Sequence, residues 1–293
     1  MSLRGLGTAL ITPFDQNKNV DYKALKRLLD KQIEGGVDYI VVLGTTGEAA
    51  TLTESEKAQV RTFVRDYVAE RVTLVLGVGG NNTAAVCEQL RTTDLTGYSA
   101  ILSVCPYYNK PSQEGLFQHF CAVAQASPLP IILYNVPGRT GVNLLPETVM
   151  RIYNAQPDKI AGIKEASGNL EQIKHLINLS TLSESALSTL SPKDGLLVIS
   201  GDDGLAAEIM QAGGAGLISV LSNALPEETG DLVRTADSLL QAKLNPLIGL
   251  LFKEGNPSGI KTLLSQMGLI DNYLRLPLVP NSPSVQAEIA AAL

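Results

Sequence analysis

Short apolar runs alternate along this chain with longer stretches in which apolar side chains recur every three or four residues. The first run covers residues 7–11, and the stretch that follows from Asp21 places Leu25, Leu28 and Leu29 on one face of a helix. Such periodicity predicts an amphipathic helix, whereas an apolar run of about 4–8 residues between turn residues predicts a buried strand. The chain therefore begins with a strand followed by a helix.

The same strand–helix unit recurs along the chain, and the pattern predicts eight such units. Helix ends carry recognisable signals: Thr53 and Glu56 form a capping-box pattern at one start, and Gly35 and Gly36 follow the first helix. The last helix of the series is expected over residues 226–240. The expected strands cover residues 7–11, 39–43, 72–78, 100–104, 131–134, 160–164, 196–199 and 216–220.

Continuous apolar strands separated by helices predict a parallel sheet whose outer side is covered. Eight such units within about 240 residues predict an α/β fold, the (β/α)8 or TIM barrel. The alternative is a doubly wound open sheet, which favours a GxGxxG turn after an early strand, and the sequence has no such turn. Beyond residue 240 the alternation stops, and helices are expected over 244–252, 259–267 and 284–293. We therefore expect a barrel with the active site over residues 1–240 and a C-terminal helical extension over 241–293.

Composition narrows the possible partners. Hydrophobic residues make up 45% and charged residues 18% of the 293 residues, which is typical of a soluble globular protein. A formal net charge of −6 argues against nucleic acid and against an anionic membrane surface. Three cysteines without a paired spacing favour a reducing compartment, so we expect a cytoplasmic protein. The two histidines have no metal-ligand neighbours at useful spacing, so we expect no metal.

One strand carries a residue that is costly to bury. Lys164 lies at the end of the expected strand 160–164, within Ile-Ala-Gly-Ile-Lys-Glu-Ala-Ser-Gly. An ammonium loses its hydration on burial, and a neutral amine can attack a carbonyl to form a Schiff base. The simpler explanation is that Lys164 reaches from the strand end into water. The next residue, Glu165, should point away from the barrel interior because side chains alternate along a strand.

Other reactive side chains follow the carboxyl ends of neighbouring strands, where active sites of this fold lie. Thr45 and Thr46 sit in a Gly-Thr-Thr-Gly turn whose backbone N–H groups can bind a carboxylate. Tyr134 can move protons beside a reacting amine, and Arg139 offers a fork of donors for a second carboxylate. A turn without ligand, a phenol on the core and a surface salt bridge are common alternatives for these residues taken singly. Together they predict Schiff-base chemistry with a phenolic proton shuttle and no organic cofactor.

These motifs resemble those of a known family of pyruvate-dependent class I aldolases, which includes dihydrodipicolinate synthase and N-acetylneuraminate lyase. The resemblance extends from Thr8 to Lys261 and rests on three segments in particular: Gly-Thr-Thr-Gly-Glu from Gly44, Tyr-Asn-Val-Pro from Tyr134 and Gly-Ile-Lys-Glu from Gly162. Within the family, Arg139 is typical of the synthases. The implied reaction joins pyruvate to L-aspartate 4-semialdehyde in lysine and diaminopimelate biosynthesis.

The resemblance also implies catalytic roles for particular residues. Lys164 would form the Schiff base with pyruvate, and Tyr134, Thr45 and Tyr108 would form a proton relay. Tyr108 would reach into the site of a neighbouring subunit, so the resemblance implies an oligomer, commonly a homotetramer built as a dimer of dimers.

Four further residues would bind the substrates. Thr46 would hold the pyruvate carboxylate and Arg139 the carboxylate of the semialdehyde, while Gly201 and Ile218 would line the pyruvate pocket.

The chain departs from the family in a pocket where L-lysine regulates some bacterial members. Asn81 and Tyr107 match that pocket, but a serine, two histidines and a glutamate are replaced. Their positions are occupied here by Ala49, Glu54, Lys57 and Ala85. Because Ala85 removes a carboxylate that would pair with the lysine ammonium, we expect weak or absent inhibition by lysine.

Two other functions remain open on the sequence. The same scaffold could act on a different aldehyde or 2-keto acid, such as N-acetylneuraminate, a 2-keto-3-deoxy sugar acid or a hydroxyproline-derived substrate. Alternatively, the chain could be a catalytically silent relative that acts by binding, which the presence of Lys164, Tyr134, Thr45 and Thr46 argues against.

Overall fold

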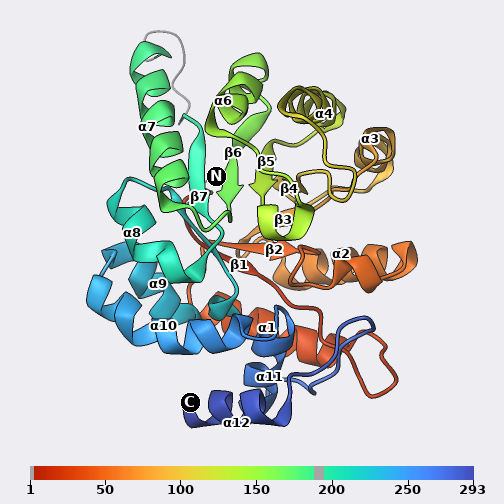
Figure 1. Ribbon diagram of the computed structural model, residues 1–293. Coiled ribbons are helices and arrows are strands. Elements are labelled where there is room, and N and C mark those ends of the chain that lie inside the picture. Colours follow the sequence, from red (N-terminus) through yellow and green to blue (C-terminus); the bar gives the residue numbers. More distant parts are fainter. Residues whose placement is uncertain (1–2, 188–194) are drawn as a thin grey trace.

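The computed structural model describes residues 3–187 and 195–293 and contains a closed barrel of parallel strands. Each strand pairs with the next along the chain, and the last pairs with the first (Figure 1). The strands are β1 (Gly5–Ala9), β2 (Tyr39–Val42), β3 (Thr73–Gly77), β4 (Ala100–Val104), β5 (Ile131–Asn135), β6 (Ile160–Glu165), β7 (Leu197–Ser200) and β8 (Gly216–Ser219).

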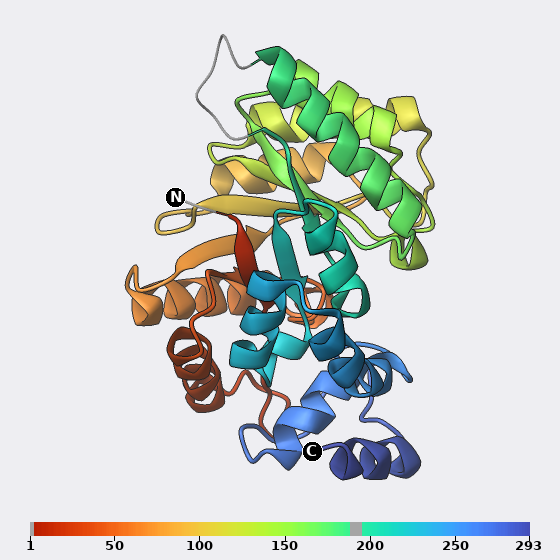
Figure 2. The same cartoon turned by 90° about the vertical axis from the view of Figure 1, so that its left-hand side faces the viewer.

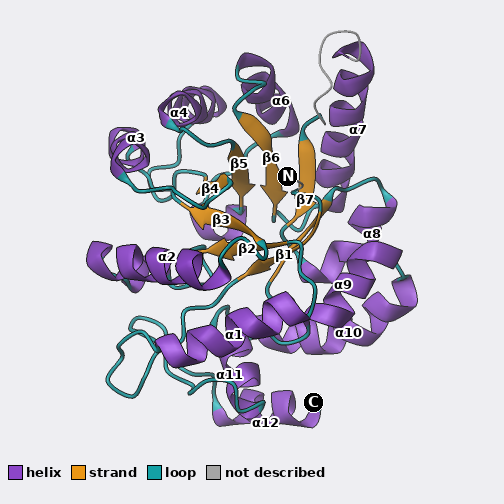
Figure 3. Cartoon of the chain, turned by 180° about the vertical axis from the view of Figure 1, so that it is seen from behind, coloured by secondary structure: helices purple, strands orange, loops and turns teal. Residues whose placement is uncertain are grey.

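Helices surround the barrel and follow its strands, as the view from behind in Figure 3 shows. The barrel helices are α1 (Tyr22–Glu34), α2 (Glu54–Val68), α3 (Thr83–Thr92), α4 (Gln113–Ala126), α5 (Pro137–Thr140), α6 (Pro146–Ala155), α7 (Leu170–Leu187), α8 (Ala206–Gln211) and α9 (Pro226–Thr235). Three 3-10 turns cover Ala49–Thr51, Asp203–Leu205 and Leu221–Asn223. The extension contains α10 (Ser238–Phe252), α11 (Ser258–Gln266) and α12 (Pro283–Ala291).

The alternation of side chains along the strands creates two hydrophobic cores. Tyr39, Val41 and Ile199 belong to a cluster inside the barrel, whereas Ile40 and Val42 belong to the cluster between the strands and the helices. Strands that are apolar on both faces are what a covered parallel sheet requires. The expected (β/α)8 barrel with C-terminal helices is confirmed, and the open-sheet alternative is wrong.

Several expected boundaries are wrong. The extension helix expected over 244–252 begins at Ser238, and the first strand begins at Gly5 instead of residue 7. The helix expected over 226–240 is divided: α9 ends at Thr235, Ala236 adopts a left-handed conformation with φ of 51°, and Asp237 caps α10. The first strand ends at Ala9, because the N–H of Ile11 donates to the Asn223 side chain instead of continuing the ladder. The domain boundary proposed at residue 240 falls inside α10, and the division itself stays a prediction.

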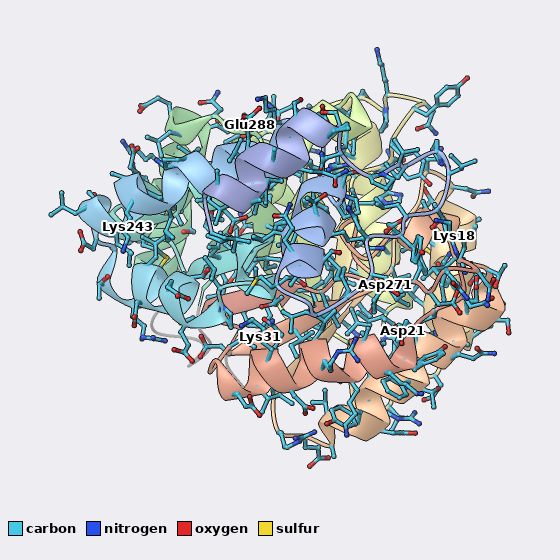
Figure 4. All side chains as sticks on the ribbon, turned by 90° about the horizontal axis from the view of Figure 1, so that it is seen from below. Lys18, Asp21, Lys31, Lys243, Asp271 and Glu288 are labelled. Atoms are coloured by element: carbon cyan, nitrogen blue, oxygen red, sulfur yellow. The ribbon has the colours of Figure 1, made fainter. Side chains whose placement is uncertain are left out.

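The extension lies beside α1 and the loop that precedes it, at one side of the barrel (Figure 2). Figure 4 views this region from below, with Lys243 on α10, Glu288 on α12 and Asp271 near α1. Arg275 donates to the carbonyl oxygen of Lys18 at 2.6 Å, which ties the extension to the N-terminal loop. Within residues 3–187 and 195–293, none of the helices has the length and apolar character that a membrane span requires.

Candidate active site

Lys164 lies inside the barrel opposite Tyr134. The two residues are register partners on β6 and β5, and their side chains are 6% and 6% exposed. The Lys164 Nζ atom is 4.4 Å from the centroid of the Tyr134 ring, a favourable distance for a cation–π contact. Within the described part of the chain, Lys164 forms no ion pair with a carboxylate. The Lys164 Nζ atom therefore faces the Tyr134 ring and has no carboxylate partner among the described residues.

The residues that follow Tyr134 and Lys164 connect β5 to β6 on the outer face of the barrel. Asn135 and Glu165 are register partners, and Asn135 Nδ2 donates to Glu165 Oε2 at 2.9 Å. Burial raises the pKa of Glu165, and hydrogen bonds from Asn135, Ser167 and Gln172 oppose this rise. The expectation that Glu165 points away from the barrel interior is confirmed, because its partner Gln172 belongs to α7.

The glycine at the end of β7 leaves space for the lysine. A Cβ atom on Gly201 would lie 2.9 Å from Lys164 Cε and 3.1 Å from Lys164 Cγ. Its N–H donates to the Glu165 carbonyl oxygen at 2.7 Å, which fixes its backbone beside β6. Ile218 on β8 is 1% exposed and belongs to the same inner cluster as Tyr134. Gly201 and Ile218, the two residues expected to line the pyruvate pocket, thus lie on the inner face of the barrel.

The Gly-Thr-Thr-Gly turn follows β2 and presents its two threonines differently. Thr45 is exposed, whereas Thr46 is 3% exposed and its Oγ1 accepts a hydrogen bond from Asn256 Nδ2 at 2.9 Å. The turn closes through the Gly47 N–H, which donates to the Gly44 carbonyl oxygen at 3.1 Å. A rigid turn of this kind can hold a carboxylate with hydroxyl and backbone donors.

Arg139 lies on α5, a single helical turn that the sequence analysis did not predict. Pro137 starts this turn, and Gly141 ends it with a positive φ of 74°. Arg139 Nη2 donates to the carbonyl oxygen of Asn256 at 3.1 Å. The turn therefore presents the guanidinium toward the segment that also contacts Thr46.

A cavity of about 380 Å³ joins several of these groups at the carboxyl ends of the strands. A volume of this size is typical of small-molecule sites. Its lining includes Thr45, Tyr107, Tyr134 and Arg139. The lining does not include the other expected site residues Lys164, Thr46, Gly201 and Ile218. Lys164 is connected to the cavity through Tyr134, because its Nζ atom lies 4.4 Å from the Tyr134 ring centroid.

Within one chain, Tyr108 does not line the cavity that Thr45, Tyr134 and Arg139 line. Its side chain is 89% exposed, and its backbone has a positive φ of 74°. Tyr107, which the sequence analysis gave no catalytic role, lines the cavity instead, and its carbonyl oxygen accepts a hydrogen bond from Asn81. Asn256 also received no role from the sequence, although it lies within the stretch from Thr8 to Lys261 over which the resemblance extends.

A buried ion pair lies behind the Gly-Thr-Thr-Gly turn. Glu48 and Lys261 of α11 form an ion pair, and both side chains are fully buried. Burial lowers the pKa of Lys261 to about 8, while the Glu48 carboxylate acts in the opposite direction. Lys261 Nζ also lies 4.1 Å from the Phe14 ring centroid and donates to the Tyr273 carbonyl oxygen at 3.0 Å. The extension is thus joined to the base of the turn that carries Thr45 and Thr46.

Across residues 3–187 and 195–293, no three His, Cys, Asp or Glu side chains are grouped so that they could hold a metal ion.

Comparisons with known proteins identify relatives of this chain. The profile of the Dihydrodipicolinate synthetase family matches residues 2–293. A 4-hydroxy-tetrahydrodipicolinate synthase of Parabacteroides distasonis is 48% identical over 287 residues, which cover 96% of this chain and 92% of the relative. One of Flavobacterium psychrophilum is 48% identical over 282 residues, with 94% and 92% covered.

Solved structures of the same family are also similar to this chain. The dihydrodipicolinate synthase of Thermotoga maritima superposes with a TM-score of 0.92 and 38% identity over 100% of this chain and 98% of that one. The chloride-inhibited dihydrodipicolinate synthase of Acinetobacter baumannii, complexed with pyruvate, superposes with a TM-score of 0.91 and 38% identity. The match covers 99% of this chain and 98% of that one. With a barrel that places a buried lysine opposite a tyrosine, and with relatives matched over nearly their whole length, the chain belongs to the dihydrodipicolinate synthetase family.

Proposed function

We propose that this chain is a lyase that condenses pyruvate with L-aspartate 4-semialdehyde to give 4-hydroxy-tetrahydrodipicolinate, a step of lysine and diaminopimelate biosynthesis. The observation that carries the proposal is the buried amine of Lys164, 4.4 Å from the Tyr134 ring beside a cavity that Arg139 also lines. The names of the curated relatives, at 42–48% identity, support the same reaction.

The first half of the reaction activates pyruvate. The Lys164 amine attacks the C2 carbonyl of pyruvate, water leaves, and an imine joins the lysine to the substrate. Loss of a proton from C3 then gives an enamine, which is a carbon nucleophile. Tyr134 is the proposed proton carrier because it is adjacent to the amine, and Thr45 is its proposed partner because both residues line the cavity.

The second half forms the new carbon–carbon bond and releases the enzyme. The enamine attacks the aldehyde carbon of the semialdehyde, whose own amino group then attacks the imine carbon and expels Lys164. Thr46 is the proposed ligand of the pyruvate carboxylate, and Gly201 and Ile218 are the proposed walls of its pocket. Arg139 is the proposed ligand of the semialdehyde carboxylate, since a guanidinium can bind a carboxylate through two parallel hydrogen bonds.

The same proposal concerns assembly and location. Because Tyr108 is 89% exposed in a single chain, we assign it to the site of a neighbouring subunit in a homotetramer built as a dimer of dimers. The cytoplasm is the proposed location, and the three cysteines, which are all free thiols, are compatible with a reducing compartment.

The test measures pyruvate consumption with and without the semialdehyde, in the parent and in Arg139→Ala. We expect turnover that depends on the semialdehyde and falls at least about tenfold in Arg139→Ala, because a charge-assisted pair is lost. Pyruvate should still be trapped on Lys164 by borohydride in both proteins. Trapping without semialdehyde-dependent turnover in the parent would overturn the proposed second substrate, and would favour another aldolase of the same scaffold. Failure of the parent to trap pyruvate would favour the silent relative.

A further inference from the structure

Asn256 touches both of the groups that the proposed function assigns to substrate carboxylates. It lies between α10 and α11 and is 7% exposed. Its Nδ2 donates to Thr46 Oγ1 at 2.9 Å, and its carbonyl oxygen accepts from Arg139 Nη2 at 3.1 Å. These partners are 210 and 117 residues away along the chain. A single residue of the extension is thus bonded to both proposed subsites.

The contact with Thr46 determines the direction of its hydroxyl proton. An amide NH2 group can only donate, so the Thr46 oxygen accepts from Asn256 and its own O–H remains available to donate. A hydroxyl that donates is the form that binds a carboxylate. The opposite amide orientation would place the NH2 group where Oδ1 now lies, a buried position without a hydrogen-bond partner among the described residues. Among the described residues, the assigned orientation leaves Oδ1 and one Nδ2 hydrogen unpaired, whereas the opposite orientation would leave both hydrogens of the NH2 group unpaired.

The contact with Arg139 positions the second subsite. A guanidinium has five N–H donors, and the Asn256 carbonyl oxygen occupies one of them on Nη2. The remaining donors can still form a bidentate pair with a carboxylate. Because the carbonyl belongs to the backbone of a buried residue, it limits where the flexible arginine side chain can lie.

We propose that Asn256 is a positioning residue, whose side chain directs the Thr46 hydroxyl toward the pyruvate carboxylate while its backbone holds Arg139 for the semialdehyde carboxylate. This inference rests on the proposed function. Asn256 acts through Thr46 and Arg139, so it is distinguished from a catalytic residue by which kinetic constant its loss changes. Its loss should raise the KM for substrates far more than it lowers kcat.

The test is a double-mutant cycle between Asn256→Ala and Thr46→Val, read as the KM for pyruvate. We expect Asn256→Ala to raise this KM about tenfold in the parent, the value of one hydrogen bond to a charged group. In the Thr46→Val background the same change should alter the KM less than about twofold, because the hydroxyl that Asn256 directs is already gone. Equal factors in the two backgrounds would overturn the proposal.

Asn256→Asp provides a second readout, because an aspartate side chain has nearly the same shape as asparagine. The new carboxylate would accept the Thr46 proton and would repel both substrate carboxylates, so KM should rise for pyruvate and for the semialdehyde. An Asn256→Asp enzyme with the KM values of the parent would contradict the assigned hydroxyl direction. Asn272→Asp is the matched control, since it makes the same change in the extension at a residue whose amide bonds Thr262 at 3.3 Å. This control should leave both KM values unchanged.

Two further measurements separate the possible failures. Thermal unfolding of each variant shows whether it is folded, and Asn256→Ser takes the place of any variant that is not. Borohydride trapping of pyruvate by the parent tests the proposed function itself. A parent that traps pyruvate but gives an additive cycle would leave the proposed function intact and remove only the role of Asn256.

Discussion

A methyl group on Gly201 would lie 2.9 Å from Cε of Lys164, which is closer than carbon atoms normally approach. It would also lie 2.7 Å from the Cβ atom of Ala166. The lysine chain can rotate away, but the Ala166 Cβ atom can move only with its backbone, so both Lys164 and the segment after β6 would have to shift. The absence of a side chain at position 201 therefore helps to define where the Lys164 amine lies.

Gly201→Ala should lower kcat/KM at least about tenfold, because a displacement of about 1 Å at a reacting atom can cost a hundredfold. Stability should fall by about 1–3 kcal/mol, since the nearest atom is the Ala166 Cβ atom, which can move only with its backbone. Steady-state kinetics and thermal unfolding measure the two effects. Gly249→Ala is the control, because nothing lies within 4 Å of its added Cβ atom. Full activity in Gly201→Ala would contradict the packing argument.

The buried pair of Glu48 and Lys261 should behave as a unit in stability. Lys261→Met should lower the free energy of unfolding by about 3–5 kcal/mol, because it leaves the Glu48 carboxylate buried and unpaired. Adding Glu48→Gln should recover much of this loss, since the double variant buries no net charge. Urea unfolding of the two single variants and the double variant measures the coupling. Additive losses would show that the two groups do not interact.

Acid should destabilise the protein through two identified groups. Burial lowers the pKa of His119 to about 4, and a hydrogen bond from Arg275 is the main cause that lowers the pKa of Glu56 to about 2. In both cases the unfolded chain binds more protons than the folded one, so stability falls as pH decreases. The window runs from about 6.5 to 4 for His119 and from about 4.5 to 2 for Glu56.

Free energies of unfolding at a series of pH values test this account. After allowance for solvent screening at the partly exposed Glu56, the two groups together should contribute a loss of roughly 2–4 kcal/mol. Glu56→Gln should be less stable than the parent at pH 7 and should show a shallower decline below about 4.5. An identical decline in the parent and in Glu56→Gln would rule out the contribution of this carboxylate.

L-Lysine should inhibit the enzyme weakly or not at all. The cavity lining includes Lys57 and Ala49, and Lys57 forms an ion pair with Glu54 at 2.7 Å, while Ala85 supplies no carboxylate for an ammonium. A cationic side chain in place of an acceptor disfavours a cationic ligand. Initial rates with and without L-lysine at physiological concentration measure this directly. Marked inhibition would contradict the prediction, and Ala85→Glu asks whether one carboxylate strengthens the response.

The barrel and the chemistry at its strand ends were predictable because both depend on local patterns. The strand expected over 100–104 matches Ala100–Val104, and the inward position of Lys164 follows from side-chain alternation along β6. The placement of Tyr134 opposite Lys164 needs only the order of neighbouring parallel strands. These features require no knowledge of contacts between distant segments.

The rest depends on tertiary contacts that leave little local signal. The break between α9 and α10 occurs at an alanine in a left-handed conformation, a residue that otherwise favours helix. Asn256 contacts Thr46 across 210 residues, and Lys261 is buried against Glu48 although a lysine in that helix would normally be expected at the surface. Sequence position alone does not show that the extension contacts the Gly-Thr-Thr-Gly turn through Asn256 and Lys261.

The most direct test of the central claim is reductive trapping of pyruvate followed by mass analysis of peptides. With borohydride and pyruvate, the account predicts one added three-carbon unit per chain, located on Lys164, and none in Lys164→Ala. The semialdehyde should then be consumed by the untrapped enzyme and not by the trapped one. Modification at another lysine, or unchanged trapping in Lys164→Ala, would contradict the assignment of Lys164 as the residue that forms the Schiff base.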